Sequence, residues 1–320
     1  MIVTLTLNPS VDRTVEVETL ARGEVMRALG VRVDPGGKGI NVSRALAANG
    51  LPTRAVVTVG GAEGEHLVTL LRDTGIEIVP VRIQGAIRSN ITVVEPDGTT
   101  TKFNEPGAHL SEEELAAVFA AVTSAVESAD WLVASGSLPP GMPGNVYAEL
   151  VRLLAGSGTC VAVDTSGSAL ETVMAAGPTL VKPNREELAE VTGRQLLTIA
   201  DVVEAANRLR DLGAVAVLAS LGAECAVLVD EDGAIHGRTP AVPPLSSVGA
   251  GDAMLAGFLA GGGKGADALV EGLAWGAAAV LQPGSGMPSP ADVDRSAVRL
   301  ERPDGQRQSS QHQDLLAMPP

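Results

Sequence analysis

Short apolar runs alternate with helical segments through most of this 320-residue chain. The second half shows the pattern best, with apolar runs at 131–134, 160–163, 180–181, 214–219 and 225–229. Strands that alternate with helices predict a mostly parallel sheet covered by helices on both faces. Aromatic residues make up only 2% of the chain, so the core of this sheet must consist of aliphatic side chains.

A second pattern interrupts this alternation in the first half of the chain. The stretches 76–83, 90–95 and 99–104 alternate apolar and polar residues, and a Pro-Asp-Gly turn joins the last two. An early pair of stretches, 15–18 and 31–34, alternates in the same way. We expect these strands to form a small separate sheet, a lid over the larger one.

The domain organisation follows from these two patterns. We expect a single domain over residues 1–302, with the lid strands inserted at about 12–34 and 86–104. From Pro303 the chain becomes rich in Gln, Ser and Arg and loses apolar periodicity. Residues 303–320 are therefore expected to form a disordered tail.

The charge of the chain limits its partners. Acidic residues outnumber basic ones by 38 to 23, which gives a net charge of −15. Such a surface repels nucleic acid and anionic membranes, so neither is expected as a partner. No apolar run reaches membrane-spanning length and no leader segment precedes the first strand, so we expect a cytoplasmic protein. The scattered His and Cys residues argue against a His-ligated metal or a Ser-His triad.

One glycine-rich segment favours an anion site. Gly249-Ala250-Gly251-Asp252 leads into an apolar run with helical spacing. Glycines allow backbone N–H groups to approach a ligand, and the N-terminus of a helix favours a phosphate. Asp252 in the first helical turn is either an ordinary cap or, facing a phosphate, a general base.

Two segments near the N-terminus are candidates for substrate binding. Asp12 follows the first strand and is either a solvated turn residue or an acceptor for sugar hydroxyls. The segment Gly36–Asn41 is either a glycine-rich helix entrance or a loop that holds a polyol through its N–H groups and Asn41, with Lys38 near a phosphate. It has neither the Walker A spacing nor the dinucleotide GxGxxG spacing.

Two later segments stand where parallel strands end. In Ser135–Gly141, a stiff loop, Ser137 either donates to a phosphate oxygen or belongs to a plain connection. In Lys182–Leu188, Asn184 and Glu187 have the spacing of a helix capping box. Alternatively, they face a magnesium-bound phosphate through water, since Mg²⁺ keeps much of its hydration shell.

Together these segments resemble the phosphofructokinase B family of ribokinase-like sugar kinases. The resemblance runs from Met1 to about Arg302 and rests on seven segments in one order: Thr6–Pro9, Gly36–Val42, Ser135–Gly141, Asp164–Gly167, Lys182–Asn184 with Glu187, Ser220–Gly222 and Val248–Asp252. It implies a three-layer α/β/α fold with a mostly parallel sheet and a small β-sheet lid. It also implies an enzyme that uses ATP and Mg²⁺ to phosphorylate a sugar phosphate.

The resemblance assigns roles residue by residue. Asp252 is implied as the base that takes the proton of the accepting hydroxyl, and the anion hole for the phosphoryl group is implied at Gly249, Ala250 and Gly251. The sugar hydroxyls are assigned to Asp12, Gly37 and Asn41. The phosphate already on the sugar is assigned to Arg88, Ser137, Lys38 and Arg27. The nucleotide pocket is assigned to Lys182, Asn184, Glu187, Ser220, Gly222, Ala223, Glu224, Cys225 and Gly251. Asn184 and Glu187 are implied to hold the water shell of Mg²⁺.

Within the family the segments are most similar to kinases of fructose 1-phosphate and tagatose 6-phosphate. We therefore expect transfer to the 6-hydroxyl of fructose 1-phosphate, with fructose 6-phosphate or tagatose 6-phosphate as alternative substrates. One departure is Thr92, where fructose 1-phosphate kinases usually carry Lys, although the nearby Asn90 is kept.

Two readings from other classes remain. The first is a sugar-phosphate-binding regulator on an inactive kinase fold, against which Asp252, Asn184 and Glu187 count. The second is a dinucleotide oxidoreductase, against which the absent GxGxxG counts. Because half-exposed lid strands leave unpaired edges, we also expect two lids to pair in a homodimer.

Overall fold

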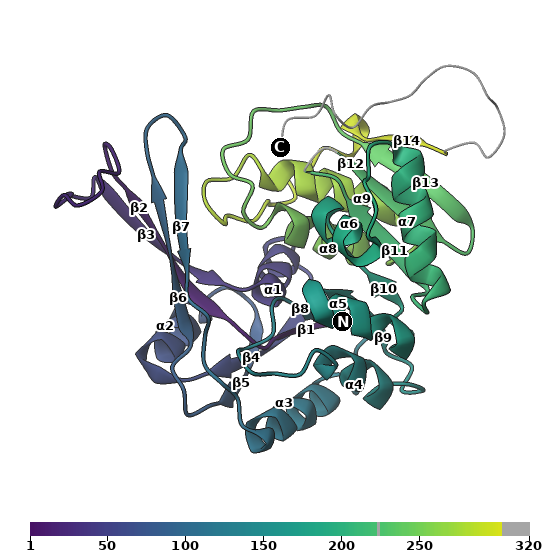
Figure 1. Cartoon of the computed structure of the whole chain (residues 1–320), viewed down its shortest axis with the longest axis horizontal. Coiled ribbons are helices and arrows are strands. Elements are labelled where there is room, and N and C mark those ends of the chain that lie inside the picture. The colour runs from purple at the N-terminus through teal and green to yellow at the C-terminus, as the bar shows by residue number, and fades with distance from the viewer. Residues whose placement is uncertain (223–224, 303–320) are drawn as a thin grey trace.

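The computed structural model describes residues 1–222 and 225–302 (Figure 1). Among these residues, ten strands form one large sheet in the order β14-β13-β12-β11-β10-β9-β8-β1-β4-β5. The strands are β1 (Ile2–Thr6), β4 (Thr53–Val59), β5 (Glu77–Arg82), β8 (Trp131–Ser135), β9 (Cys160–Asp164), β10 (Leu180–Val181), β11 (Ala216–Ser220), β12 (Cys225–Asp230), β13 (Gly233–Arg238) and β14 (Arg299–Glu301). From β5 to β11 all neighbours are parallel, as predicted.

Helices cover both faces of this sheet, which makes the fold a three-layer α/β/α arrangement (Figure 1). One face packs against α3 (Glu112–Ala125), α4 (Val146–Leu153), α5 (Gly167–Val173), α6 (Arg185–Thr192) and α7 (Ile199–Asp211). The other packs against α1 (Lys38–Ala48), α2 (Gly61–Leu71), α8 (Ala250–Ala260) and α9 (Gly265–Ala279). Two short 3₁₀ helices span Met174–Ala176 and Arg295–Ala297.

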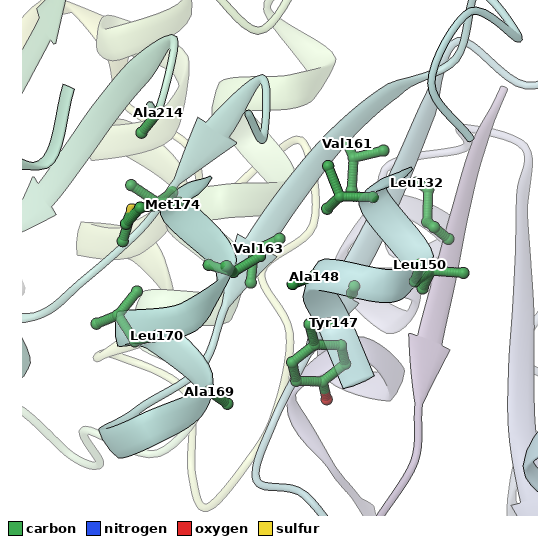
Figure 2. Packing of buried hydrophobic residues seen from close by; sticks show 14 of the residues in the cluster. Leu132, Tyr147, Ala148, Leu150, Val161, Val163, Ala169, Leu170, Met174 and Ala214 are labelled. Carbon is green, nitrogen blue, oxygen red and sulfur yellow. The ribbon is translucent and has the colours of Figure 1, made fainter. Parts of the chain in front are cut away.

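Aliphatic side chains fill the core, as the low aromatic content requires. In Figure 2, Leu132 and Val161 from the sheet face Leu150 from α4. Tyr147, the single tyrosine of the chain, lies fully buried in the same cluster. Its hydroxyl donates to the carbonyls of Ser135 (3.2 Å) and Gly136 (3.1 Å). The core therefore fixes the start of the loop that follows β8, which the sequence marks as a candidate site.

The lid is a separate four-stranded sheet in the order β3-β2-β6-β7. Its strands are β2 (Ser10–Glu16), β3 (Gly30–Gly36), β6 (Arg88–Val94) and β7 (Thr100–Asn104). The prediction of a small second sheet is confirmed, but 76–83 was wrongly included in it. This stretch contains β5, which pairs in parallel with β4 at the edge of the large sheet. An edge strand is half exposed and therefore alternates in the same way as a lid strand.

At the other edge of the large sheet, the strand at 225–229 was predicted, but the antiparallel pairing and the strands β13 and β14 were not. Strands β12, β13 and β14 run antiparallel there. β13 carries two glycines and a histidine, so it lacks the apolar pattern of a strand. A Cβ on its Gly237 would lie 2.3 Å from Leu273 Cδ1, so any larger residue would require this leucine of α9 to move. Among the described residues, no helix is both long and apolar enough to span a bilayer. The predicted tail, 303–320, lies outside the described residues.

Candidate active site

A cleft of about 520 Å³ opens at the carboxyl ends of the parallel strands, where open α/β sheets bind their ligands. Its walls come from strand ends and helix starts: Lys38, Asp164, Lys182, Asn184, Arg185, Glu186, Ser220, Leu221, Gly222, Ser247, Gly249, Ala250, Gly251, Asp252, Met254 and Gly276. Most of the glycine-rich and polar segments that the sequence singles out therefore meet at one place.

The glycine-rich turn begins helix α8 at the floor of the cleft. Gly249 is the N-cap, with a φ of 80° that favours glycine. A glycine cap has no side chain to bind the first N–H groups of the helix, and that of Ala250 makes only a long bond of 3.5 Å to the carbonyl of Ser247, so this helix start can favour an anion. Asp252 lies in the first turn and is only 7% exposed. Asn41 on α1 donates its Nδ2 to Asp252 Oδ2 at 2.8 Å.

The surroundings of Asp252 make it a stronger base than an ordinary carboxylate. Burial raises its pKa to about 6, and the charge of Asp164 adds to the rise. Lys38, the bond from Asn41 and Lys182 act in the opposite direction. A pKa near the working pH is what general base catalysis requires.

Asp164 joins two lysines in the cleft wall. Its fully buried carboxylate accepts from Lys38 Nζ (2.7 Å) and forms an ion pair with Lys182 Nζ (2.8 Å). Burial opposes the charge of Asp164, but the two lysines outweigh it and lower its pKa. Burial likewise opposes the charge of Lys38, while Asp164, Glu187 and Asp252 raise its pKa. The sequence analysis gave Asp164 no role; the available signal was a lone carboxylate ending an apolar strand.

The predicted capping box at α6 is present and lies beside this group. Asn184 Oδ1 accepts from the N–H of Glu187, and Glu187 Oε2 accepts from the N–H of Asn184, both at 2.8 Å. The other carboxylate oxygen of Glu187 lies 3.6 Å from Lys38 Nζ. A backbone bond from Ser220 N to Pro183 O (3.0 Å) places β11 next to this helix start. The capping and cleft-facing interpretations of Asn184 are therefore compatible.

The predicted nucleotide loop is described only in part. Ser220 and Gly222 line the cleft, whereas Ala223 and Glu224 lie outside the described residues. Cys225 was also assigned to the nucleotide pocket, but it is not among the residues that line the cleft. This side chain is buried in the core and its Sγ lies 2.9 Å from Nε2 of His236.

A second group of polar residues gathers where the lid leaves the large sheet. Asp12 Oδ1 accepts from Ser10 Oγ (2.6 Å) and from Asn90 Nδ2 (2.9 Å). Arg88, which precedes Asn90 on the same face of β6, donates to the carbonyls of Asn8 (3.3 Å) and Glu105 (3.2 Å).

The Asn8 side chain extends this group to the loop after β8, because its Nδ2 lies 3.3 Å from Ser137 Oγ. Asn8 thus links Arg88, through its carbonyl, to Ser137, through its side chain. Gly37, with a φ of 124°, leads from the lid into α1, and a Cβ there would lie 2.7 Å from Thr6 Cγ2.

Two residues predicted for this group lie elsewhere. Lys38 points to Asp164 and Glu187, on the side of α6, instead of to Arg88. Arg27 is exposed in the segment that joins β2 to β3, at the end of the lid strands opposite to Ser10 and Gly36. One chain therefore does not bring Arg27 to the side chains of Arg88 and Ser137.

This architecture, with its glycine-started helix, buried carboxylate and paired lysines, defines a phosphoryl-transfer enzyme with a lid. The model of the pfkB family of carbohydrate kinases matches residues 5–292. The chain therefore belongs to the pfkB family, whose members are ATP-dependent sugar kinases.

Relatives and solved structures agree with this assignment. The 1-phosphofructokinase of Rhodobacter capsulatus is 39% identical over 81% of this chain and 82% of its own length. The ATP-dependent 6-phosphofructokinase isozyme 2 of Escherichia coli is 37% identical over 94% of this chain and 99% of its own. A crystal structure of phosphofructokinase-2 from Escherichia coli, in complex with potassium, superposes with a TM-score of 0.85 at 37% identity, covering 91% of this chain and 96% of that one.

Proposed function

We propose that this protein transfers the γ-phosphoryl group of ATP to the 6-hydroxyl of fructose 1-phosphate. The observation that carries the proposal is the position of Asp252, a buried carboxylate with a pKa of about 6 beside the free N-terminus of α8. The similarity to 1-phosphofructokinases at 34–39% identity supports this choice of substrate. Fructose 6-phosphate and tagatose 6-phosphate are the alternatives, and the similarity to 6-phosphofructokinase isozyme 2 supports the first of them.

In the proposed mechanism the lid presents the sugar and α8 presents the base. Asp12 accepts hydrogen bonds from the sugar hydroxyls. Asn41 donates hydrogen bonds to them and accepts hydrogen bonds from them, and the backbone of Gly37 lies beside them. Asp252 takes the proton of the accepting hydroxyl as the new O–P bond forms and the bond from the γ-phosphorus to the ADP oxygen breaks. The N–H groups of the segment Gly249–Gly251 stabilise the charge on the transferring phosphoryl group.

We assign the nucleotide to the opposite wall of the cleft. Lys182, Ser220, Gly222 and Gly251 line this wall and are proposed to contact ATP. Lys38 lies close enough to Glu187 and Asp164 to serve the same phosphates, so we move it from the sugar side to the nucleotide side. Closure of the lid excludes water, which would otherwise accept the phosphoryl group.

The residues at α6 fit a magnesium ion held through water. Capping occupies Asn184 Oδ1 and Glu187 Oε2 and leaves Glu187 Oε1 at 3.6 Å from Lys38 Nζ, a residue of the cleft wall. No cluster of three or more carboxylate, His or Cys side chains suited to a metal occurs in residues 1–222 and 225–302. Mg²⁺ typically binds one or two carboxylates together with substrate phosphates, so the assignment depends on Glu187 and on the phosphates of ATP. When bound, Mg²⁺ would neutralise phosphate charge, and Asn184 and Glu187 would orient its water shell.

A coupled assay for ADP release tests the proposal. Fructose 1-phosphate, fructose 6-phosphate and tagatose 6-phosphate are compared at equal concentrations, with Asp252→Asn as the inactive control. We expect the highest kcat/KM for fructose 1-phosphate. A higher value for either other sugar would transfer the assignment to that substrate. No ATP turnover with any of them would favour a sugar-phosphate-binding regulator.

We also propose that two lids pair in a homodimer. The lid face opposite to Asp12 and Asn90 carries Val31, Ile91 and Phe103, which are 56%, 38% and 55% exposed. Apolar side chains gathered on one sheet face favour burial against a partner. Light scattering should give twice the chain mass, and Phe103→Glu should give a monomer. A wild-type monomer would exclude the proposal. A tetrameric form, such as the inhibited form solved for phosphofructokinase-2 from Escherichia coli, would require a further interface.

Two further proposals concern the extent of the catalytic unit and the location of the protein in the cell. Residues 1–302 are proposed to form the catalytic unit, supported by the family match, which ends at residue 292. The protein is proposed to work in the cytoplasm, where ATP and sugar phosphates are available; fractionation of cells followed by the kinase assay tests this location.

A further inference from the structure

Arg44 on helix α1 lies behind the proposed base and has no role in the account given so far. It does not line the cleft, and its side chain is half-buried between α1, the lid strand β3 and the segment after α9. Its Nη1 lies 3.3 Å from Asn41 Oδ1, 3.1 Å from Ser285 Oγ and 3.4 Å from the carbonyl of Pro35. A single guanidinium nitrogen thus joins three parts of the fold next to Asn41.

The chemistry of the three side chains fixes the order of donors and acceptors. A guanidinium only donates hydrogen bonds, and an ionised carboxylate only accepts them. Asn41 lies between Arg44 and Asp252, so its Oδ1 must face Arg44 and its Nδ2 must face Asp252. The distances of 3.3 Å and 2.8 Å agree with this order. Without Arg44, the Asn41 amide could turn and present its oxygen to the carboxylate.

We propose that Arg44 is a positioning residue, which holds the Asn41 amide so that its Nδ2 stays directed at the carboxylate of Asp252. The contacts with Pro35 and Ser285 hold the guanidinium in turn, one from the lid strand and one from the segment after α9. This inference rests on the proposed role of Asp252 as the base.

The charged groups around both ends of this chain of contacts remain in place when Arg44 is removed. Asp252 is faced by Lys38 from α1, Asp164 from β9 and Lys182, which follows β10. Around Arg44 itself, Asp12 of β2 and both Asp34 and Arg32 of β3 lie close enough to affect its charge. If the Asn41 amide no longer donates to Asp252, the ionised carboxylate loses a stabilising hydrogen bond. The pKa of Asp252 should therefore rise.

The first experiment compares Arg44→Met with wild type in kcat, KM and the pH dependence of kcat. We expect kcat to fall about tenfold, which is the value of one hydrogen bond. The acidic limb of the profile should move to higher pH by about half a unit to one unit. A tenfold change in the ionisation constant of Asp252 corresponds to one pKa unit, and the loss of one hydrogen bond gives at most about this change. KM for ATP should stay nearly constant. An unchanged kcat with an unchanged acidic limb would overturn the proposal.

A matched control separates positioning from stability. Arg54 is also partly buried and also donates to a backbone carbonyl, that of Ala125 at 2.9 Å, but at the far end of β4. Arg54→Met should lower the melting temperature and leave the acidic limb in place. If Arg54→Met moved the limb as much as Arg44→Met, the effect would be structural and the proposal would be wrong.

A double-mutant cycle tests whether Arg44 acts through Asn41. In an Asn41→Ala background, Arg44→Met should lower kcat by less than twofold, since the amide it holds is gone. A full tenfold loss in that background would overturn the proposal. If Arg44→Met does not fold, the cycle is run with Arg44→Lys, which keeps the charge but not the planar fork. Any loss it causes in wild type should likewise vanish in the Asn41→Ala background, and a loss that persists would overturn the proposal.

Asp252→Asn distinguishes failure of this inference from failure of the proposed function. If Asp252→Asn keeps near-normal kcat, then Asp252 is not the base and the proposed mechanism fails. If Asp252→Asn is inactive while Arg44→Met keeps the wild-type pH profile, only the positioning role of Arg44 fails.

Discussion

Replacing the proposed base should change activity and stability in opposite directions. Asp252→Asn keeps the shape of the side chain and its acceptor for Asn41, but it removes the charge. We expect kcat to fall about 10²–10⁴-fold, the usual contribution of a general base. The fold should nevertheless become more stable at neutral pH, because the wild-type carboxylate is ionised in a buried place that disfavours its charge.

The size of the stabilisation follows from the pKa of Asp252. Burial, with a contribution from Asp164, raises this pKa from 3.8 to about 6. This shift lowers the free energy of unfolding of the wild type at pH 7 by about 3 kcal/mol, which Asp252→Asn should recover. A carboxyl whose pKa is higher in the folded state binds more protons when folded. Its contribution to stability is therefore complete below about pH 4 and is lost as the pH rises through about 6.

Thermal unfolding of both proteins between pH 4 and pH 7 tests this reasoning. Asp252→Asn should melt several degrees above wild type at pH 7, and the difference should shrink toward pH 4. The acidic limb of wild-type kcat should fall near pH 6, because protonation removes the base. A mutant that is less stable than wild type at pH 7, or an acidic limb near pH 4, would refute the assignment of a raised pKa.

Three further predictions concern the cleft and the C-terminal segment. Arg88→Ala should raise KM for the sugar phosphate about ten- to 150-fold and leave KM for ATP nearly constant, with Arg88→Lys restoring only part; an unchanged KM would remove Arg88 from the phosphate site. Asp164→Asn should lower the free energy of unfolding by about 3–5 kcal/mol, because it leaves Lys182 buried without its partner; thermal unfolding showing no loss would contradict this. Deleting 303–320 should leave kcat and the melting temperature unchanged, since the segment lacks apolar periodicity, and a drop in either would show that the segment takes part.

The central strands of the parallel part could be predicted because they are buried on both faces. β1, for example, is buried at all five positions, and three of its residues, Ile2, Val3 and Leu5, are apolar, as expected for a strand covered on both faces. The assignment of 76–83 to the lid failed because half-exposed edge strands of either sheet share one pattern. β14 was missed because it has three residues and depends on pairing with β13. Such pairing is a tertiary effect that local patterns do not contain.

The candidate site was predictable where the backbone itself imposes the residue type. Gly37 and Gly249 have positive φ values, so the sequence must carry glycine there and the loops can be recognised. Asp164 and Arg44 are different, because their surroundings are supplied by distant segments. Asp164 meets Lys38 from 126 positions away, and Arg44 meets Ser285 from 241 positions away. Their roles could therefore not be read from local spacing.

In the folded chain, the positive groups available to two phosphorylated substrates differ from those expected from the sequence. In a chain with a net charge of −15, the resemblance assigned the phosphate of the sugar to Arg27, Lys38 and Arg88, together with Ser137. In the folded chain Lys38 is paired with Asp164, and Arg27 lies at the other end of the lid. We therefore propose that the N–H groups at the start of α8, which carry partial positive charge without side-chain partners, share the anion binding with Lys38 and Lys182. On this proposal, glycine suits the N-cap position because a side-chain cap would occupy the N–H groups that the phosphate needs.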